Sequence, residues 1–302
     1  MRLLNCMFTY NRPHYLRNAT ESLLEFFRLG DMLVVDDGSS DPEQVRYLAE
    51  LEGRGVSILR RPRGDDMAVR AHGGLYRRMN DAVDYANARG YDYVQFVQDD
   101  MQFVWHDPEL LAKAEKIFAR FPDASQVWLT FLKATDWDVR DRLDYLHDAH
   151  CYRHRRQALI DTGIFRLEAL RREQMRFENW EQSNSNAFLA KGYHAYLLPT
   201  PVLAWIPWPM TFTRDQKFGK VRSRPERYYL KPLSAAQIQQ LTSRPLEELA
   251  FHEDYCFPWG WGCWTPYWFN AYRWHHWWKY TCLAVRASRT GRLRIPHWRR
   301  WR

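Results

Sequence analysis

The chain has 302 residues, which is enough to bury a large core in one or two domains. Its composition, 46% hydrophobic and 26% charged, is that of a globular protein and excludes a low-complexity chain. The formal net charge of +8 favours anionic partners such as phosphates, nucleic acid or acidic lipid.

The cysteines and the first residues bear on the compartment. Five cysteines at scattered spacings predict no disulfide framework and favour a reducing environment. The opening MRLLNCMFTYNRP reaches polar side chains too soon for the apolar part of a secretory signal. No run of about 18 apolar residues predicts a membrane-spanning helix. We therefore expect a cytoplasmic protein.

Strand and helix patterns alternate along about the first hundred residues. Strands are predicted at residues 2–8, 32–37, 56–61 and 91–98. Helices are predicted at 12–29, from Pro42 onward, and at 73–90. Ser40 or Asp41 is placed to cap the second helix, with Pro42 in its first turn. This alternation predicts an α/β fold, with a parallel sheet and helices on both of its faces.

The pattern is less regular in the second third of the chain. A helix is predicted at 107–122 with Asp107 as its cap, a strand at 125–133, a strand end and helix at 161–173, and a helix followed by a strand at 178–199. The composition shifts near Thr213. We therefore predict one domain at 1–213 and a separate C-terminal part at 214–302.

The C-terminal part contains four kinds of segment. They are a basic linker or mobile lid at 214–232, a helix at 234–241, a tryptophan-rich stretch at 256–282 and an arginine-rich tail at 286–302. The aromatic side chains suit stacking on a glycan, a membrane interface, or a lid or dimer contact. The basic tail favours association with an anionic membrane surface. Cys256, Cys263, His275 and His276 fit the spacing of no common zinc site.

Polar clusters follow three of the predicted strands. TYNR follows the first strand, DDGSS the second and DDM the fourth. Turn chemistry alone accounts for any one of them. The carboxyl ends of parallel strands meet at one edge of a sheet, where ligands bind. Three clusters at one edge therefore predict a ligand site.

Six stretches of the chain carry a family resemblance. In order they are TYNRPHYL, VVDDGSSD, GGLYRRMNDAVDYA, FVQDDM, DTGIFR and WEQSNSNAFLAKGY. They resemble an inverting glycosyltransferase of the GT-A fold, family 2, and cover about the first two-thirds of the chain. The resemblance implies a Rossmann-like, mostly parallel sheet flanked by helices, with residues 1–213 as the GT-A domain and a tryptophan-rich basic extension after it. The extension resembles no family that we can name.

The paired acids after the fourth strand are assigned to the metal by this resemblance. Asp100 is the metal-binding acid of the DxD-type motif, and Asp99 faces the ribose or a metal-bound water. Gln98 stands where the motif has its first acid, which leaves fewer carboxylates for the ion. A divalent cation, Mn²⁺ or Mg²⁺, would neutralise the diphosphate of a nucleotide-sugar donor. The alternative is a strand-end pair neutralised by arginines.

The nucleotide would lie against the other two clusters. Asp37 is assigned as the acceptor for a base N–H, which favours uracil, and Tyr10 as the residue that stacks on the base. Thr9 and Arg12 would surround the ribose and phosphates. Arg70 is assigned to the diphosphate, with Arg77 and Arg78 as nearby competitors. Asp36 either holds its loop or contacts the ribose.

The resemblance implies a catalytic base one turn into a helix, eleven residues before a Gly-Tyr pair; counting back from Gly192 gives Glu181. Inverting transfer needs a carboxylate that removes the proton of the acceptor hydroxyl. Glu178 is the competing residue, and Trp180 either stacks on the acceptor sugar or packs. An ordinary helix acid in a first turn is the alternative for Glu181.

The resemblance predicts a hexosyltransferase-type enzyme of polysaccharide biosynthesis. Its partners would be a UDP-linked donor, a glycan or lipid-linked saccharide acceptor, and an anionic membrane surface on which it is peripheral. One alternative is an inactive GT-A-like protein that binds nucleotide-sugar or glycan. A nucleotidyltransferase is disfavoured because TYNRPHYL lacks glycines. No recognition motif supports nucleic acid as a partner.

Overall fold

The computed structural model describes residues 2–62, 74–132, 139–178, 180–206 and 230–256. The strands are β1 (Leu3–Thr9), β2 (Asp31–Asp36), β3 (Ser57–Arg60), β4 (Tyr93–Gln98), β5 (Met101–Phe103), β6 (Ala124–Trp128), β7 (Leu143–Leu146), β8 (Cys151–His154), β9 (Gly163–Arg166), β10 (His194–Leu197) and β11 (Leu203–Trp205). The helices are α1 (Pro13–Phe26), α2 (Pro42–Gly53), α4 (Leu75–Ala88), α5 (Leu110–Arg120), α6 (Leu167–Arg172), α7 (Glu181–Ala190), α8 (Ala235–Ser243) and α9 (His252–Tyr255).

Nine of the described strands form one sheet in the order β3-β2-β1-β4-β9-β6-β10-β8-β7. The pairings of β2 with β3, β1 with β2, β1 with β4 and β6 with β10 are parallel. The pairings that involve β8 or β9 are antiparallel, so only these two strands run against the others. The predicted α/β architecture, a mostly parallel sheet flanked by helices, is confirmed. β5 and β11 form a separate two-stranded sheet.

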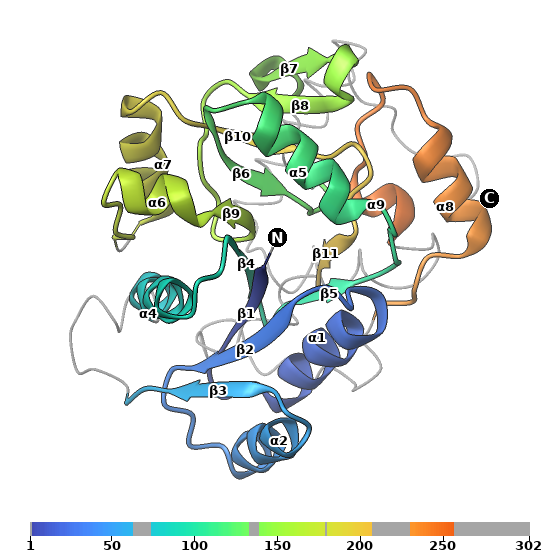
Figure 1. Cartoon of the computed structure of the whole chain (residues 1–302). Coiled ribbons are helices and arrows are strands. Elements are labelled where there is room, and N and C mark those ends of the chain that lie inside the picture. Colours follow the sequence, from blue (N-terminus) through green and yellow to red (C-terminus); the bar gives the residue numbers. More distant parts are fainter. Residues whose placement is uncertain (1, 63–73, 133–138, 179, 207–229, 257–302) are drawn as a thin grey trace, which may run out of the picture. The chain divides into compact units, whose positions relative to one another are not determined.

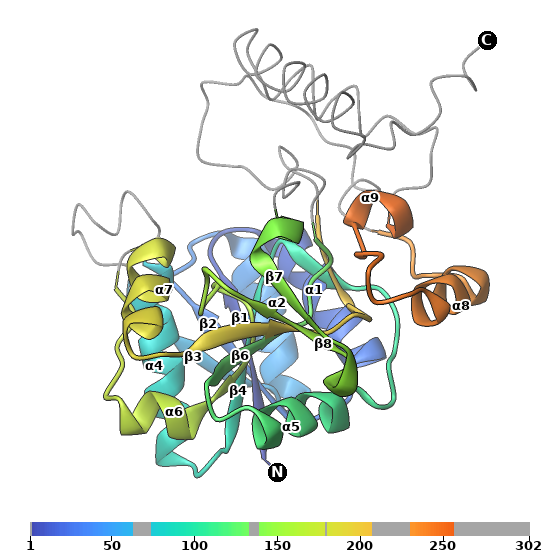
Figure 2. The same ribbon diagram turned by 90° about the horizontal axis from the view of Figure 1, so that it is seen from above.

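The two faces of the sheet are covered by different helices. Leu3 and Met7 of β1 pack with α1, α2 and α5, whereas Leu4, Cys6 and Phe8 pack with α4, α6 and α7. Figure 1 shows α4, α6 and α7 together on one side of the sheet, and Figure 2 shows them on the side away from α8 and α9. Burial on both faces explains the nearly continuous apolar sequences of the central strands.

Helix α2 begins as its sequence predicts. Asp41 is the N-cap, and its side chain accepts hydrogen bonds from the backbone N–H groups of Glu43 at 2.9 Å and Gln44 at 3.2 Å. Pro42 occupies the first turn, where no backbone N–H is needed. The cap also holds the backbone of Gln44, whose side chain belongs to the site described below.

Helix α5 begins later than predicted, with Glu109 and not Asp107 at its N-cap. Asp107 is buried, and its carboxylate accepts from the backbone N–H of Glu109 at 3.0 Å and from Lys113 Nζ at 2.7 Å. It therefore stabilises the turn before the helix. β5, β7, β8 and β11 are strands of three or four residues that the sequence pattern does not predict.

Residues 230–256 pack with the sheet, although they fall in the predicted C-terminal part. Leu230, Leu233 and Leu241 are buried in the same cluster as Leu3 and Met7. The predicted helix at 234–241 is confirmed as α8, with Ser234 as its cap. The division at residue 213 stays a prediction. The basic segment up to residue 229 and residues 257–302 lie outside the described residues.

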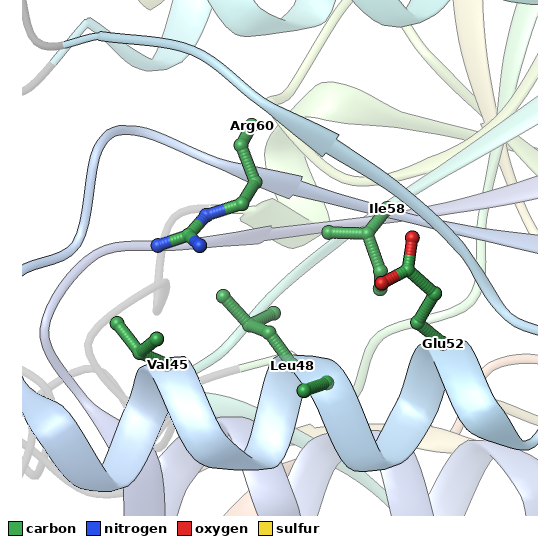
Figure 3. A pocket seen from close by; sticks show the side chains of 6 residues that line it. Val45, Leu48, Glu52, Ile58 and Arg60 are labelled. Carbon is green, nitrogen blue, oxygen red and sulfur yellow. The ribbon is translucent and has the colours of Figure 1, made fainter.

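A surface pocket lies between α2 and the edge strand β3 (Figure 3). Val45, Leu48 and Glu52 face it from the helix, and Ile58 and Arg60 face it from the strand. β3 has a neighbour on one side only, and of these side chains Leu48 is buried while Val45 and Ile58 are partly exposed. Of the described helices, none is long and apolar enough to cross a membrane.

Candidate active site

The carboxyl ends of β1, β2 and β4 lie side by side, as the sequence predicts. Thr9 is in register with Asp36, and its carbonyl accepts a hydrogen bond from the Asp37 N–H at 3.1 Å. On the other side of β1, the Asp99 N–H donates to the carbonyl of Phe8 at 3.1 Å. The three polar clusters are therefore neighbours at one edge of the sheet.

Asp99 is held by residues of the first cluster. The Thr9 hydroxyl donates to Asp99 Oδ2 at 2.9 Å, and Arg12 Nη1 donates to Asp99 Oδ1 at 3.0 Å. Burial raises the pKa of the Asp99 carboxyl, while the Arg12 charge and the Thr9 hydrogen bond oppose that rise. Both oxygens of Asp99 already have protein partners. Its predicted role toward the ribose or a metal-bound water stays a prediction.

Asp100 is the more exposed of the two acids. Its side chain is 19% exposed against 6% for Asp99, and its Oδ2 lies 3.6 Å from Arg12 Nη1. Burial on its own lowers the pKa of Arg12, but the charges of Asp99 and Asp100 outweigh burial and raise it. Arg12 therefore stays protonated between the two carboxylates and reduces their mutual repulsion.

The described residues contain no group of three His, Cys, Asp or Glu side chains that could hold a metal ion. The protein would supply one or two carboxylates from the Asp99–Asp100 pair. Gln98 places an amide where a third carboxylate would otherwise be. Mg²⁺ is commonly held in this way, by few carboxylates together with substrate phosphates and water. The donor set therefore fits a divalent cation that binds together with a diphosphate.

Asp36 holds its loop, which is the first of the two alternatives predicted for it. It is fully buried and accepts from the Ser39 N–H at 3.0 Å, from the Ser39 hydroxyl, and from Gln44 Nε2 at 3.2 Å. Gln44 Nε2 also donates to the Thr9 hydroxyl at 3.0 Å. Gln44 thus connects α2 to the ends of β1 and β2.

Asp37 forms a buried ion pair with Arg78 of α4. Arg78 Nε donates to Asp37 Oδ1 at 2.8 Å, and the two side chains are 8% and 6% exposed. Asp37 Oδ2 is buried and has no hydrogen-bond partner among the described residues. Gly74, with φ of 72°, lies beside it, and a Cβ there would lie 3.2 Å from Asp37 Oδ2. Glycine therefore leaves space next to an unsatisfied carboxylate oxygen.

Replacing Arg78 by Met should lower the free energy of unfolding by about 3–5 kcal/mol, because it leaves the Asp37 charge buried without its partner. Urea unfolding measures this. Arg176→Met is the matched control, since the Arg176–Asp84 pair is exposed by 60% and 56%. The control should change stability by less than about 1 kcal/mol. Equal losses in both variants would show that the Asp37 pair is not special.

The β1–α1 loop is tied to the loop after β2. Asn11 has a left-handed φ of 48°, which asparagine tolerates, and its Oδ1 accepts from the N–H groups of Ser40 at 2.8 Å and Asp41 at 2.9 Å. Tyr10, next to it, is only partly buried and is not a core aromatic. Arg70 lies in residues 63–73, outside the described part of the chain.

The predicted base is the first residue of α7. Glu181 Oε1 accepts a hydrogen bond from Gln157 Nε2 at 3.0 Å. Burial, followed by the charges of Asp161 and Glu181, raises the pKa of Tyr76 in α4, so both carboxylates are close enough to Tyr76 to act on it. Phe96 is in register with Gly163, which puts Asp161 just past the carboxyl end of β4. Glu181 is therefore on the α4 side of the same sheet edge.

The competing acid and the neighbouring tryptophan are both exposed. The Glu178 side chain is exposed, and only its backbone is held, by Asn184. Trp180 is 59% exposed and is the only large hydrophobic side chain of the described residues that is classed as exposed. The reading in which Trp180 packs in a core is therefore not supported.

A comparison with protein-family models decides the family. The model described as glycosyl transferase family 2 matches residues 6–168, which is more than half of the chain. The chain belongs to glycosyltransferase family 2. The matched range contains Asp37, Asp99 and Asp100 but ends before Glu181. The resemblance stated from the sequence is thus confirmed, and so is the GT-A type of α/β fold.

Solved structures similar to this glycosyltransferase family 2 chain are distant. S. aureus TarS 1-349 is 19% identical with a TM-score of 0.47, over 68% of this chain and 60% of that chain. The mannosyltransferase PcManGT from Pyrobaculum calidifontis, in complex with GDP-Man and Mn²⁺, is 18% identical with a TM-score of 0.47, over 69% and 58%. S. aureus TarS 1-349 in complex with UDP is 16% identical with a TM-score of 0.47, over 93% and 78%.

The chain spans 60% of S. aureus TarS 1-349, 42% of S. aureus TarS and 58% of PcManGT, which is less than two-thirds of the length of each. No curated protein was found to match it.

Four polar residues of this family 2 chain were not assigned a site role from its sequence. They are Gln44, Arg78, Gln157 and Asp161. Arg78 was named only as a competitor for the diphosphate, and Asp161 only as part of the DTGIFR stretch. Gln44 and Arg78 lie on amphipathic helices and Gln157 lies in a loop, where glutamine and arginine are ordinary surface residues, so nothing in the local pattern marks them. Only Asp161, two residues before the glycine that begins β9, had a local signal.

Proposed function

We propose that this chain transfers a sugar from a UDP-linked donor to a hydroxyl group of a glycan or lipid-linked saccharide, with inversion and with the help of Mn²⁺ or Mg²⁺. The observation that carries the proposal is the meeting of Asp37, Arg12 and the Asp99–Asp100 pair at three adjoining strand ends. Asp37 would accept a hydrogen bond from the nucleobase, Arg12 supplies a positive charge, and the two carboxylates could bind a metal ion. Together these groups suit a nucleoside diphosphate and its metal.

Asp37 would recognise the base of the nucleoside. Its unsatisfied Oδ2, beside Gly74, suits the N–H of a pyrimidine ring. A buried acceptor without a donor is costly, so a base that supplies an N–H is favoured over one that does not. Tyr10 would stack on the base. Because stacking tolerates any base, selectivity for uracil would come mainly from Asp37.

The diphosphate would lie against Asp100 and Arg12, while Thr9 and Gln44 keep Asp99 in place. A divalent cation held by Asp100 would stabilise the negative charge that develops on the leaving diphosphate. Arg12, which is protonated and partly exposed, adds a second positive charge on the protein side. Arg70 stays a proposed contact to the diphosphate.

Glu181 would remove the proton from the acceptor hydroxyl as that oxygen attacks the anomeric carbon. Its carboxylate is held by Gln157, and it belongs to the element that faces α4 across Tyr76. A single attack from the side opposite the leaving diphosphate inverts the anomeric carbon. We also propose that the sugar is a hexose and that the enzyme acts in polysaccharide biosynthesis. Its proposed location is the cytoplasm, peripheral on an anionic membrane surface.

The second candidate is a protein that binds nucleotide-sugar or glycan without turnover. Gln98 favours it, because an amide replaces the first acid of the motif and cannot bind a cation as a carboxylate does. Gln98 Nε2 is buried without a hydrogen-bond partner among the described residues, so it is available to a ligand oxygen. The two candidates share the donor site and differ in what Glu181 does.

Thermal melting with UDP, GDP, dTDP and CMP, each with and without Mn²⁺, tests the donor site. A ligand that binds only the folded chain stabilises it by about 2.7 kcal/mol at a concentration of 100 Kd. We expect the largest rise in Tm with UDP and Mn²⁺ together, and a smaller rise with UDP alone. If no nucleotide raises Tm, the chain does not bind a nucleotide-sugar and the proposal fails.

A further inference from the structure

The loop between β8 and β9 is fixed by hydrogen bonds from three other elements. The Gln157 carbonyl accepts from the Ala195 N–H of β10 at 3.0 Å. The Ala158 N–H donates to Ser185 Oγ of α7 at 3.0 Å, and the Ala158 carbonyl accepts from Ser125 Oγ of β6 at 2.5 Å. The start of the loop is thus attached to the helix that carries Glu181.

A fully buried glutamine of β6 fixes the rest of the loop. Gln126 Oε1 accepts from the Ile160 N–H at 2.9 Å and from Trp128 Nε1 at 2.8 Å. Gln126 Nε2 donates to the carbonyls of Ile160, at 3.0 Å, and Thr162. The loop ends at Gly163, where φ is 102° and a Cβ would lie only 2.7 Å from the Val127 carbonyl. This satisfied network specifies a single loop conformation.

The loop presents one side-chain donor to the predicted base. Gln157 Nε2 donates to Glu181 Oε1 at 3.0 Å and to the Leu159 carbonyl at 3.2 Å. Because the backbone of Gln157 is attached to β10 and its amide also to Leu159, the direction of the donated N–H is fixed. Neither contact depends on the nucleotide site.

We propose that Gln157 is a positioning residue for Glu181, orienting its carboxylate and favouring the ionised form that accepts the proton of the acceptor hydroxyl. The inference rests on the proposed function for the role of Glu181. A hydrogen bond to the charged form of a carboxyl group stabilises that form. The N-terminal end of α7 acts in the same direction.

Two other titratable groups, Tyr76 and Asp161, lie in the region of Glu181. Tyr76 of α4 faces Glu181 and stays neutral, because burial and then the charges of Asp161 and Glu181 raise its pKa. Asp161, at the end of the same loop, is a second carboxylate whose charge acts on Tyr76. Without a donor such as Gln157, Glu181 would be protonated over a wider pH range and would be a poorer base.

The test measures the pKa of Glu181 directly in the full chain, without any ligand. The protein is labelled with carbon-13 at the glutamate carboxyl, and the Glu181 signal is assigned by its loss in Glu181→Gln. We expect Gln157→Leu to raise the Glu181 pKa by about one unit. Gln157→Glu, which is nearly isosteric and adds a negative charge, should raise it further. The main-chain contacts of Gln157 remain in both variants.

Gln182→Leu is the matched control. Gln182 is on the same helix, and its amide bonds to Asn186 on the exposed face. It should leave the Glu181 pKa unchanged. If Gln157→Leu and Gln157→Glu both leave that pKa unchanged while the melting curve shows a folded protein, the positioning role is overturned.

Measuring kcat across pH distinguishes a failure of this inference from a failure of the proposed function. The probes are UDP-glucose and UDP-N-acetylglucosamine, with release of UDP followed across pH. We expect the acid limb of kcat in Gln157→Leu to move upward by the same shift as the Glu181 pKa. A pKa shift with an unmoved acid limb would overturn the proposal, because Glu181 would then not be the base. No turnover of any probe, with the pKa shift present, would count against the proposed function and leave the Gln157–Glu181 contact intact.

Discussion

Replacing Glu181 by Gln is expected to lower kcat by about 100- to 10,000-fold, the usual contribution of a general base. The amide keeps the size of the side chain but cannot accept the proton of the acceptor hydroxyl. Affinity for UDP should not change, because Glu181 accepts a hydrogen bond from Gln157 and is not among the residues that we assign to the donor. Release of UDP from UDP-sugars measures kcat, and calorimetry measures UDP binding.

Glu178→Gln is the control for this experiment. Glu178 lies three residues earlier, its side chain is exposed, and its backbone bonds to Asn184 do not depend on the carboxylate. It should retain nearly full kcat. If Glu181→Gln stays active while Asp161→Asn loses activity, Asp161 is the base. If all three variants and the wild type bind UDP without turnover, the binding-protein alternative takes first place.

Asp100→Asn should lower the affinity for UDP in the presence of Mn²⁺ by at least about 10-fold. Even residues that only orient a metal ligand change metal affinity by about 10- to 100-fold, and a direct ligand should matter no less. Without Mn²⁺ the variant should bind UDP no more weakly than the wild type, since the amide removes a negative charge that repels the diphosphate when no cation lies between them. Calorimetric titration with UDP, with Mn²⁺ and with a chelator, measures both affinities.

Asp148→Asn is a suitable control, because its side chain is 90% exposed and its nearest cation, Arg120, is 3.8 Å away. It should bind UDP as the wild type does under both conditions. A wild-type chain that binds UDP equally with Mn²⁺ and with chelator would contradict the metal assignment. Arg12 would then be the group that neutralises the diphosphate, and the Gln98 amide would donate a hydrogen bond to it.

The sequence predicted the central sheet because the signals for it are local. An apolar run of strand length, an amphipathic helix and a turn residue lie within about twenty residues of one another, as with Asp41 and Pro42 at the start of α2. The rule that parallel strands end at one edge then brought Thr9, Asp37 and Asp99 together. Motif resemblance added roles for Asp100 and Glu181, which stay predictions.

The contacts that hold these residues depend on which elements become neighbours. Gln44 reaches Thr9 across 35 positions, Arg78 reaches Asp37 across 41, and Gln157 reaches Glu181 across 24. β9 follows β6 in the chain but lies between β4 and β6 in the sheet. The period of apolar residues shows which face of an element is buried, but not which polar group on another element its side chains will meet. The sequence by itself therefore determined the strand ends and their acids, and only the tertiary structure decided which donors hold each carboxylate, because hydrogen bonds form between neighbours in space and not in sequence.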